Sequence, residues 1–334
     1  MGKFKNRIKM VQNGIQKIIS KITLAFLPDI AKIVDGVTFL NSKLDEQNKH
    51  RDLLANIVGK LIHQHNMDNT KEILKNLQLA EFQVYSQWGD DGIIQFLVSY
   101  LNIKNKKFIE FGVECYSEAN TRYLLINNNW EGLIIDGSQQ NIDHVKQSEL
   151  NWKYNLTSIC AFITKENINK LIKESRFDGE IGLLHIDIDG NDYWIWKEIT
   201  VCNPIIVIVE YNSVFGDNND WTIPYQEDFI RANVHKSCLY FGASLGALCS
   251  LANEKGYSFV GCNSAGNNAY FVRNDQVGAL KLLTANEGYV LSQFREARDE
   301  NGKLTYITGK DRLHAIEGMP IYNLKSNRVV QITC

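Results

Sequence analysis

The 334-residue chain has little proline, no excess of charge of either sign and no tract rich in proline, glycine and serine. It contains 4 Pro, and 36 Lys+Arg stand against 38 Asp+Glu, for a formal net charge of −2. This balance argues against the broad basic field of a non-specific nucleic-acid binder. The missing tracts leave no obvious flexible linker. Hydrophobic residues make up 44% of the chain, a globular composition that argues against wholesale disorder.

The seven cysteines are odd in number and scattered, and no two of them form a Cys-x-x-Cys pair. We therefore expect neither a disulfide scaffold nor a zinc knuckle, and a reducing cytosol fits best. The apolar run at 22–27 is short and has no small-residue cleavage site behind it. We expect no signal peptide, no transmembrane span and a cytoplasmic location.

Residues 1–80 differ in character from the rest and predict a helical, coiled-coil oligomerisation region. From Ile33 to Leu61 apolar residues recur every three to four positions, and Gln47 and Arg51 are polar positions within the seam. This period favours a homo-oligomer, with a helix packed on its own domain as the alternative. Residues 3–27 add lysines to another apolar stripe. That pattern suits either a solvated helix of the same bundle or peripheral contact with the inner membrane face.

Residues 81–334 show the alternation of an α/β domain. Nearly continuous apolar runs suit strands that are buried on both faces of a parallel sheet, and stretches able to form helices separate them. The runs are 107–113, 132–136, 157–163, 182–187 and 204–210, and the helical stretches are 120–127, 140–150 and 165–174. A helix at 244–255 and an antiparallel terminal hairpin at 257–262 and 268–273 follow. We expect a doubly wound, mostly parallel Rossmann-like sheet, with a further helix and a small hairpin within 287–334.

The first predicted strand ends in Glu110 and Gly112. A dinucleotide site needs a Gly-x-Gly-x-x-Gly turn, but Gly112 is the only glycine here, and Glu114 and Glu118 would repel phosphate. An acid followed by a single close-approach glycine suits a ligand with an ammonium and a sulfonium group, namely S-adenosyl-L-methionine. We expect Glu110 to offset that charge and Gly112 to leave room for the methionine part.

The second predicted strand ends in Asp136, Gly137 and Ser138. A carboxylate at this place is the usual acceptor for ribose hydroxyls. Its spacing from Glu110 does not separate S-adenosylmethionine from NAD, but the missing glycines do. Ala161 and Phe162, at the third strand, are expected to lie against the adenine.

Acidic residues follow the fourth and fifth predicted strands. Asp187 and Asp189 end one strand, while Glu210 and Asn212 follow the next. Because adjacent parallel strands point their carboxyl ends at one crevice, we expect these groups to converge. Carboxylate and amide oxygens suit Mg²⁺ or Mn²⁺, which would lower the pKa of an acceptor hydroxyl. General-base catalysis by Asp187, Asp189 or His235 is the metal-free alternative.

Four segments follow one another in order: Tyr-Ser-Gln-Trp-Gly-Asp-Asp-Gly-Ile at 85–93, Phe-Ile-Glu-Phe-Gly-Val at 108–113, Gly-Leu-Ile-Ile-Asp-Gly-Ser at 132–138 and His-Ile-Asp-Ile-Asp-Gly-Asn-Asp at 185–192. Together they resemble the corresponding segments of the FkbM-type methyltransferases. The resemblance covers about residues 83–275 and implies a class I methyltransferase fold, with S-adenosylmethionine as methyl donor and sugars or bacterial secondary metabolites as acceptors. The cofactor contacts expected are Gln87, Glu110, Gly112, Asn120, Thr121, Asp136, Gly137, Ser138, Ala161, Phe162 and Asp187.

The resulting hypothesis is an S-adenosylmethionine-dependent O-methyltransferase that acts on a hydroxyl of a sugar or of a bacterial surface glycan precursor. The partner is then a carbohydrate or small-molecule acceptor and not a nucleic acid. Trp88 and Trp221 are candidates for stacking on a sugar, whereas Trp194 and Trp196 suit helix packing better. Two alternatives stay open: a metal-dependent nucleotide-sugar glycosyltransferase that uses Asp187-x-Asp189, and a non-catalytic oligomeric scaffold.

Overall fold

The computed structural model describes residues 39, 43, 47 and 50–334. The basic stripe at 3–27 and most of the predicted seam upstream of residue 50 lie outside these residues. The chain forms two compact units, Met1–Ile57 and Val58–Cys334. In the first unit residues 50–57 are helical, and Leu53 and Leu54 are exposed.

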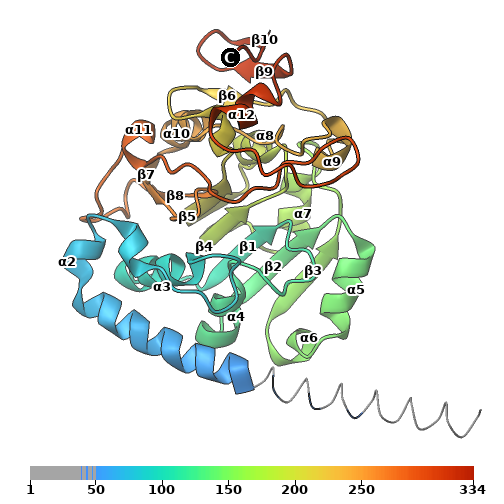
Figure 1. Cartoon of the computed structure of the whole chain (residues 1–334). Coiled ribbons are helices and arrows are strands. Elements are labelled where there is room, and N and C mark those ends of the chain that lie inside the picture. The colour runs from blue at the N-terminus through green and yellow to red at the C-terminus, as the bar shows by residue number, and fades with distance from the viewer. Residues whose placement is uncertain (1–38, 40–42, 44–46, 48–49) are drawn as a thin grey trace, which may run out of the picture. The chain divides into compact units, whose positions relative to one another are not determined.

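The second unit is built on a seven-stranded sheet with the strand order β3-β2-β1-β4-β5-β8-β7 (Figure 1). Five strands run parallel: β1 (Lys107–Phe111), β2 (Glu131–Asp136), β3 (Leu156–Cys160), β4 (Gly179–Ile186) and β5 (Cys202–Glu210). The strands β7 (Tyr257–Cys262) and β8 (Asn268–Arg273) close the sheet as an antiparallel pair. The predicted fold class, a mostly parallel α/β sheet that ends in an antiparallel hairpin, is confirmed.

Helices cover both faces of this sheet because neighbouring strand residues point to opposite sides. One face packs on α7 (Ile168–Glu174), α8 (Asp192–Glu198) and α10 (Leu245–Lys255), and the other on α3 (Asp90–Tyr100) and α4 (Arg122–Asn128). Two further helices, α5 (Gln139–Gln147) and α6 (Leu150–Lys153), follow β2. None of the helices in the described residues has both the length and the apolar character needed to cross a membrane.

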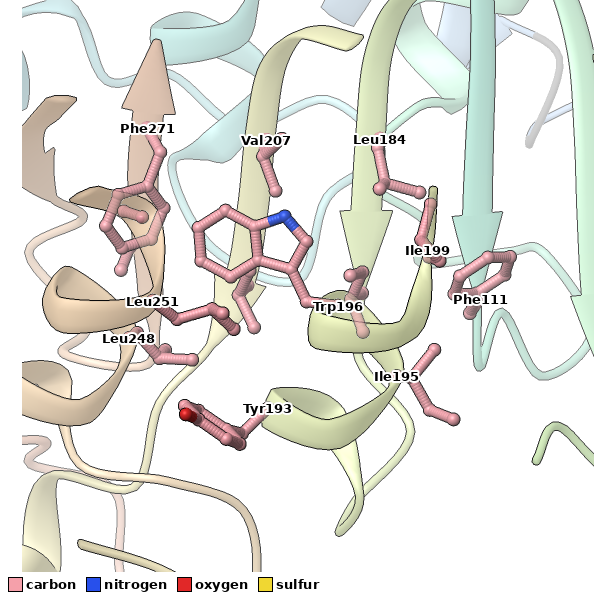
Figure 2. Packing of buried hydrophobic residues seen from close by; sticks show 14 of the residues in the cluster. Phe111, Leu184, Tyr193, Ile195, Trp196, Ile199, Val207, Leu248, Leu251 and Phe271 are labelled. Carbon is pink, nitrogen blue, oxygen red and sulfur yellow. The ribbon is translucent and has the colours of Figure 1, made fainter. Parts of the chain in front are cut away.

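Trp196 lies in the hydrophobic core between the sheet and the helices α7, α8 and α10. Its side chain is 1% exposed, and its ring centroid lies 5.0 Å from that of Phe271. Figure 2 shows the indole between Leu248 and Leu251 of α10 and the sheet residues Val207 and Phe271. Trp196 is thus a helix-packing residue, as predicted.

A smaller layer, here called the cap, is formed by chain from two places: the stretch after β5 and the C-terminal residues. Its three-stranded sheet has the order β10-β9-β6, made of β6 (Trp221–Thr222), β9 (Pro320–Asn323) and β10 (Arg328–Gln331). The short helices α9 (Arg231–Val234), α11 (Ala285–Gly288) and α12 (Lys310–His314) complete the C-terminal half. The expected helix and hairpin within 287–334 are therefore present, but the pairing of β9 with β6 was not predicted.

The remaining elements are short: α2 (Thr70–Ile73), η1 (Leu77–Ala80) and η2 (Ser213–Phe215). The third strand is shorter than the sequence predicts: β3 ends at Cys160, whereas the predicted run continues to residue 163. The last backbone hydrogen bond to β2 here runs from Ala161 N to Asp136 O at 3.0 Å. Beyond it the chain leaves the sheet, so that Ala161 and Phe162 line a cavity instead of extending a strand.

Candidate active site

A cavity of about 680 Å³ lies where β1, β2, β4 and β5 end. This is the crevice in which open α/β sheets bind ligands, and its volume is in the range of small-molecule sites. The loops after the strands form one part of its wall, and residues 229–231 and 294–304 of the cap form another. The predicted residues that line it are Gln87, Gly112, Asp136, Gly137, Ala161, Phe162, Asp187, Asp189 and Glu210, together with Trp88.

Gly112 has a positive φ of 69° and lies against the end of β4. A Cβ atom at this position would lie 1.7 Å from the carbonyl oxygen of Asp187. Glycine is therefore required both for the left-handed conformation and for the close approach of two strand ends. Glu114 and Tyr116, in the same loop, also have positive φ values of 48° and 59°. Such backbone strain gathers at functional sites.

The carboxylate of Glu110 is bound by groups of the protein itself. It accepts hydrogen bonds from Asn120 N at 2.9 Å, from Thr121 N at 3.1 Å and from the Thr121 hydroxyl. It also lies 2.9 Å from Nδ1 of His185. Asn120 and Glu110 line a smaller cavity of about 50 Å³, which shares Gln87, Gly112 and Asp187 with the larger one. Glu110 thus fixes the start of α4 beside the main cavity.

His185 is a packed core residue, with 3% of its surface exposed. Burial alone would lower the pKa of His185, but the hydrogen bond and the negative charge of Glu110 raise that pKa above its usual value. The two side chains therefore stabilise each other in the interior.

Asp136 is held firmly at the end of β2. One carboxylate oxygen accepts Glu114 N at 2.8 Å, and the other accepts Ser138 N at 2.8 Å and Nδ2 of Asn141 at 3.2 Å. Ser138 does not line the cavity but caps α5 by accepting Asn141 N at 3.3 Å. The turn is thus fixed while Asp136 and Gly137 face the cavity, with the half-exposed ring of Phe162 beside them.

Three acidic side chains converge at the ends of β4 and β5, as predicted. One carboxylate oxygen from each of Asp187, Asp189 and Glu210 lies within 4.8 Å of the other two. Glu210 is 8% exposed, and its Oε2 is buried without a hydrogen-bond partner among the described residues. Asp192 does not join them, because its oxygens accept Ile188 N at 2.8 Å and Gly190 N at 2.9 Å and so close the loop after β4.

Burial and crowding favour the protonated forms of Asp187 and Glu210. Burial, with the nearby charge of Asp189, raises the pKa of Asp187 to about 7. Burial and the charge of Asp187 raise the pKa of Glu210 well above its usual range. A carboxyl group that is poised near neutral pH can take up or release a proton under physiological conditions.

Arg231, from the cap, supplies the counter-charge, and the sequence analysis missed it. Its Nη1 donates to Asp189 Oδ1 at 2.6 Å, its Nε donates to the Cys238 carbonyl at 2.6 Å, and its Nη2 pairs with Glu296 Oε2 at 2.6 Å. The guanidinium also lies over the ring of Phe241, 3.6 Å from its centroid. No local pattern points to Arg231, since 42 positions separate it from Asp189.

Two predicted residues lie apart from the acidic cluster. Asn212 donates to the carbonyls of Leu239 and Phe241 at 2.9 and 3.0 Å and accepts Val214 N at 3.0 Å, so it holds the chain after β5. His235 contacts Ser237 Oγ at 2.8 Å through its Nδ1. Neither residue lines the cavity. Thr121 is likewise buried behind it, bonded to Glu110.

The other missed residues come from the C-terminal segment. Phe294, Arg295, Glu296, Arg298 and Leu304 all line the cavity. The ring of Phe294 stacks on that of Trp88, with centroids 5.9 Å apart and an angle of 21° between the planes. No motif marks this segment, which reaches the site only because the cap folds over the strand ends.

Comparison with known proteins gives a likeness to solved structures alone. No family model and no curated protein matches the chain. A S-adenosylmethionine-dependent methyltransferase from Clostridium acetobutylicum is 12% identical, with a TM-score of 0.37 over 62% of this chain and 98% of its own.

Two further structures were solved in complex with SAH. An O-methyltransferase from Bacillus cereus is 13% identical, with a TM-score of 0.37 over 64% of this chain and 90% of its own. The plantazolicin methyltransferase BamL, whose complex also holds a triazolic desmethylPZN analog, is 14% identical, with a TM-score of 0.35 over 67% and 97%.

Proposed function

We propose that the chain is an S-adenosylmethionine-dependent O-methyltransferase that acts on a hydroxyl of a sugar or of a bacterial surface glycan precursor. The observation that carries the proposal is one cavity that joins Gly112, Asp136 and the acidic cluster of Asp187, Asp189 and Glu210. A ribose-binding acid, a close-approach glycine and groups able to activate an acceptor thus share a single crevice.

In this proposal the adenosine lies beside Asp136, Gly137 and Phe162. The carboxylate of Asp136 is already oriented by two backbone N–H groups and can accept ribose hydroxyls with its remaining lone pairs. The methionine part lies toward Gly112 and Gln87, next to the smaller cavity. Acidic groups on this side favour a cationic ligand over a dinucleotide, whose phosphates they would repel. When bound, S-adenosylmethionine supplies a methyl group on a sulfonium.

The acidic cluster activates the acceptor. Asp187, whose pKa burial raises to about 7, is suited to take the proton of an acceptor hydroxyl near neutral pH. Bound S-adenosylmethionine would supply the methyl group, and the carboxylate of Asp187 would take the proton that the acceptor hydroxyl gives up. Correct alignment of acceptor and donor supplies much of the rate enhancement in such transfers.

The same residues fit a divalent cation. Asp187, Asp189 and Glu210 would hold Mg²⁺ or Mn²⁺, because three hard oxygens lie within 4.8 Å and Glu210 Oε2 is buried without a partner among the described residues. When bound, the ion would lower the pKa of the acceptor hydroxyl. Asn212 is left out of this set, since its amide is used within the cap. Asp189 would then serve both the ion and Arg231, which donates to its Oδ1.

Isothermal titration with S-adenosylhomocysteine, with and without Mg²⁺, tests the proposal. Asp136→Asn should weaken binding about tenfold or more, since hydrogen bonds to a charged group contribute about 1.5–3 kcal/mol. Asp143→Asn, an exposed change on the helix that follows, should leave binding unchanged. Asp189→Ala should mainly lower turnover.

Controls with NADH and UDP-sugars separate the alternatives. Both carboxylates of Asp187-x-Asp189 reach the cavity, as a nucleotide-sugar glycosyltransferase would require. Binding of a UDP-sugar without binding of S-adenosylhomocysteine would replace the proposal with that activity. If no ligand binds, the non-catalytic scaffold is favoured.

A further inference from the structure

Part of the cavity wall carries positive charge that the protein does not neutralise. Arg295 and Arg298 line the cavity and are both exposed. Within the part of the chain that the structure describes, Arg295 has no hydrogen bond or ion pair. The side chain of Arg298 makes a single hydrogen bond there, from Nη1 to the carbonyl of Gly302 at 2.8 Å. Arg231, in contrast, forms ion pairs with Asp189 and Glu296.

The segment that carries these two arginines is anchored at both ends. Ser292 is buried, and its hydroxyl lies 2.7 Å from that of Ser213 and 2.8 Å from Nη1 of Arg312. At the other end, Arg298 N donates to the carbonyl of Ser237 at 3.2 Å. The arginines therefore start from a fixed backbone, which lowers the entropy lost when they bind a ligand.

An aromatic surface belongs to the same wall. Phe294 precedes Arg295 directly and stacks on Trp88. The two rings offer an apolar face on which a sugar ring can lie, and charged groups line the same cavity. The cavity therefore offers three kinds of contact: the acidic cluster, an aromatic wall and the two arginines.

We propose that the acceptor is an anionic sugar, whose phosphate or carboxylate is bound by Arg295 and Arg298 while its hydroxyl reaches the acidic cluster. The inference rests on the proposed function and names its substrate class. Guanidinium groups bind both anions through paired hydrogen bonds. The acidic cluster repels the anionic group of such an acceptor, so the charges orient the acceptor with its hydroxyl toward the acidic cluster and its anionic group toward the two arginines. A neutral sugar would offer neither arginine an anion with which to pair.

Binding of simple probes tests this proposal. Glucose-1-phosphate, glucuronate and glucose are titrated into the full chain, with and without S-adenosylhomocysteine. We expect at least one anionic probe to bind about tenfold or more tightly than glucose, since hydrogen bonds between charged groups are the stronger ones. Its affinity should fall between about 50 mM and about 500 mM NaCl, because exposed charges are screened. If glucose-1-phosphate is the probe that binds, the anionic group of the acceptor is a phosphate; if glucuronate binds, that group is a carboxylate.

The double variant Arg295→Gln and Arg298→Gln should remove this preference and leave the affinity for S-adenosylhomocysteine unchanged. Arg328→Gln, on exposed β10, is the matched control and should have no effect. Equal affinity for glucose and both anions would overturn the proposal, and so would loss of S-adenosylhomocysteine binding in the double variant, because the arginines would then serve the cofactor. If S-adenosylhomocysteine fails to bind the wild-type chain, the proposed function fails, while the titrations without it still decide the anion site.

Discussion

At Asp187 the demands of stability and of the proposed activity conflict. The side chain is half-buried beside two other acids, yet it lines the cavity and faces the acceptor in our proposal. We predict that Asp187→Asn makes the protein more stable at high pH and abolishes its turnover. The asparagine keeps the shape of the side chain and removes one of three converging negative charges.

The size of the effect follows from the pKa. Burial and Asp189 raise the pKa of Asp187 from 3.8 to about 7. At about 1.4 kcal/mol per pH unit this corresponds to about 4 kcal/mol of unfolding free energy. Because water from the cavity reaches the half-buried carboxyl, we expect about 2–3 kcal/mol at about pH 8.

The raised pKa of Asp187 also fixes the direction in which the unfolding free energy changes with pH. The folded state holds the proton more tightly than the unfolded chain does, so the contribution to stability is fully present below pH 3.8 and is lost as the pH rises through about 7. Asparagine resembles the protonated acid at every pH. The difference in unfolding free energy between variant and wild type should therefore be near zero at about pH 4 and grow toward about pH 8.

Urea unfolding in the presence of EDTA, followed by circular dichroism across this range, measures the difference. Asp143→Asn, an exposed acid on α5, is the matched control and should stay within about 0.5 kcal/mol of wild type at every pH. An Asp187→Asn protein that is less stable than wild type at high pH, or a difference that does not change with pH, would refute the reasoning. Added Mg²⁺ should raise the melting temperature of the wild type and not that of the variant, because ligand binding stabilises the folded state.

Three further predictions concern the shape of the site and the assembly. Gly112→Ala should lower the unfolding free energy clearly more than Gly302→Ala does, because Gly302 has a similar φ of 74° but no atom within 4 Å of an added Cβ. The positive φ alone costs about 1 kcal/mol or more in each variant. The difference between the two variants, measured from urea midpoints, therefore reports the contact of the added Cβ with the Asp187 carbonyl. Asp91 accepts Val84 N, Tyr85 N and Ser86 N at 2.7, 2.6 and 2.9 Å. Asp91→Ala should cost about 2–4 kcal/mol in the same assay, because three backbone donors lose their acceptor, whereas Asp91→Asn keeps an acceptor oxygen and should cost much less; equal costs would contradict this account. Leu54 and Leu61, which are 63% and 62% exposed, lie in the predicted coiled-coil seam. Changing both to Lys should convert the expected oligomer to a monomer in light scattering, and a monomeric wild type would show the seam prediction to be wrong.

The parallel strands could be predicted because a strand that is buried on both faces has an almost uninterrupted run of apolar residues. The run at 204–210 falls within β5, and the run at 132–136 falls within β2. The end of β3 could not be predicted in this way, because Ala161 and Phe162 are as apolar as the strand before them. Their position depends on the cavity, which tertiary structure creates.

The convergence of Asp187, Asp189 and Glu210 could also be predicted, since parallel neighbours end at the same edge of a sheet. The hydrogen bonds inside the site could not be predicted. Nothing in the sequence shows that the carboxylate of Glu110 accepts hydrogen bonds from the start of α4, or that Asn212 holds the chain after β5. Both residue types suit ligand binding and backbone capping equally well, and only the positions of the donors decide between them.

The cap explains how so acidic a site can persist. Three converging carboxylates would repel one another strongly in a partly buried place, and His185 of β4 offsets only part of this repulsion at Asp187. Arg231 comes from the cap, binds Asp189 and Glu296 together and is held over Phe241. This guanidinium offsets part of the negative charge without filling the cavity. Folding of the cap and ionisation of the acidic cluster are therefore linked, because each favours the other.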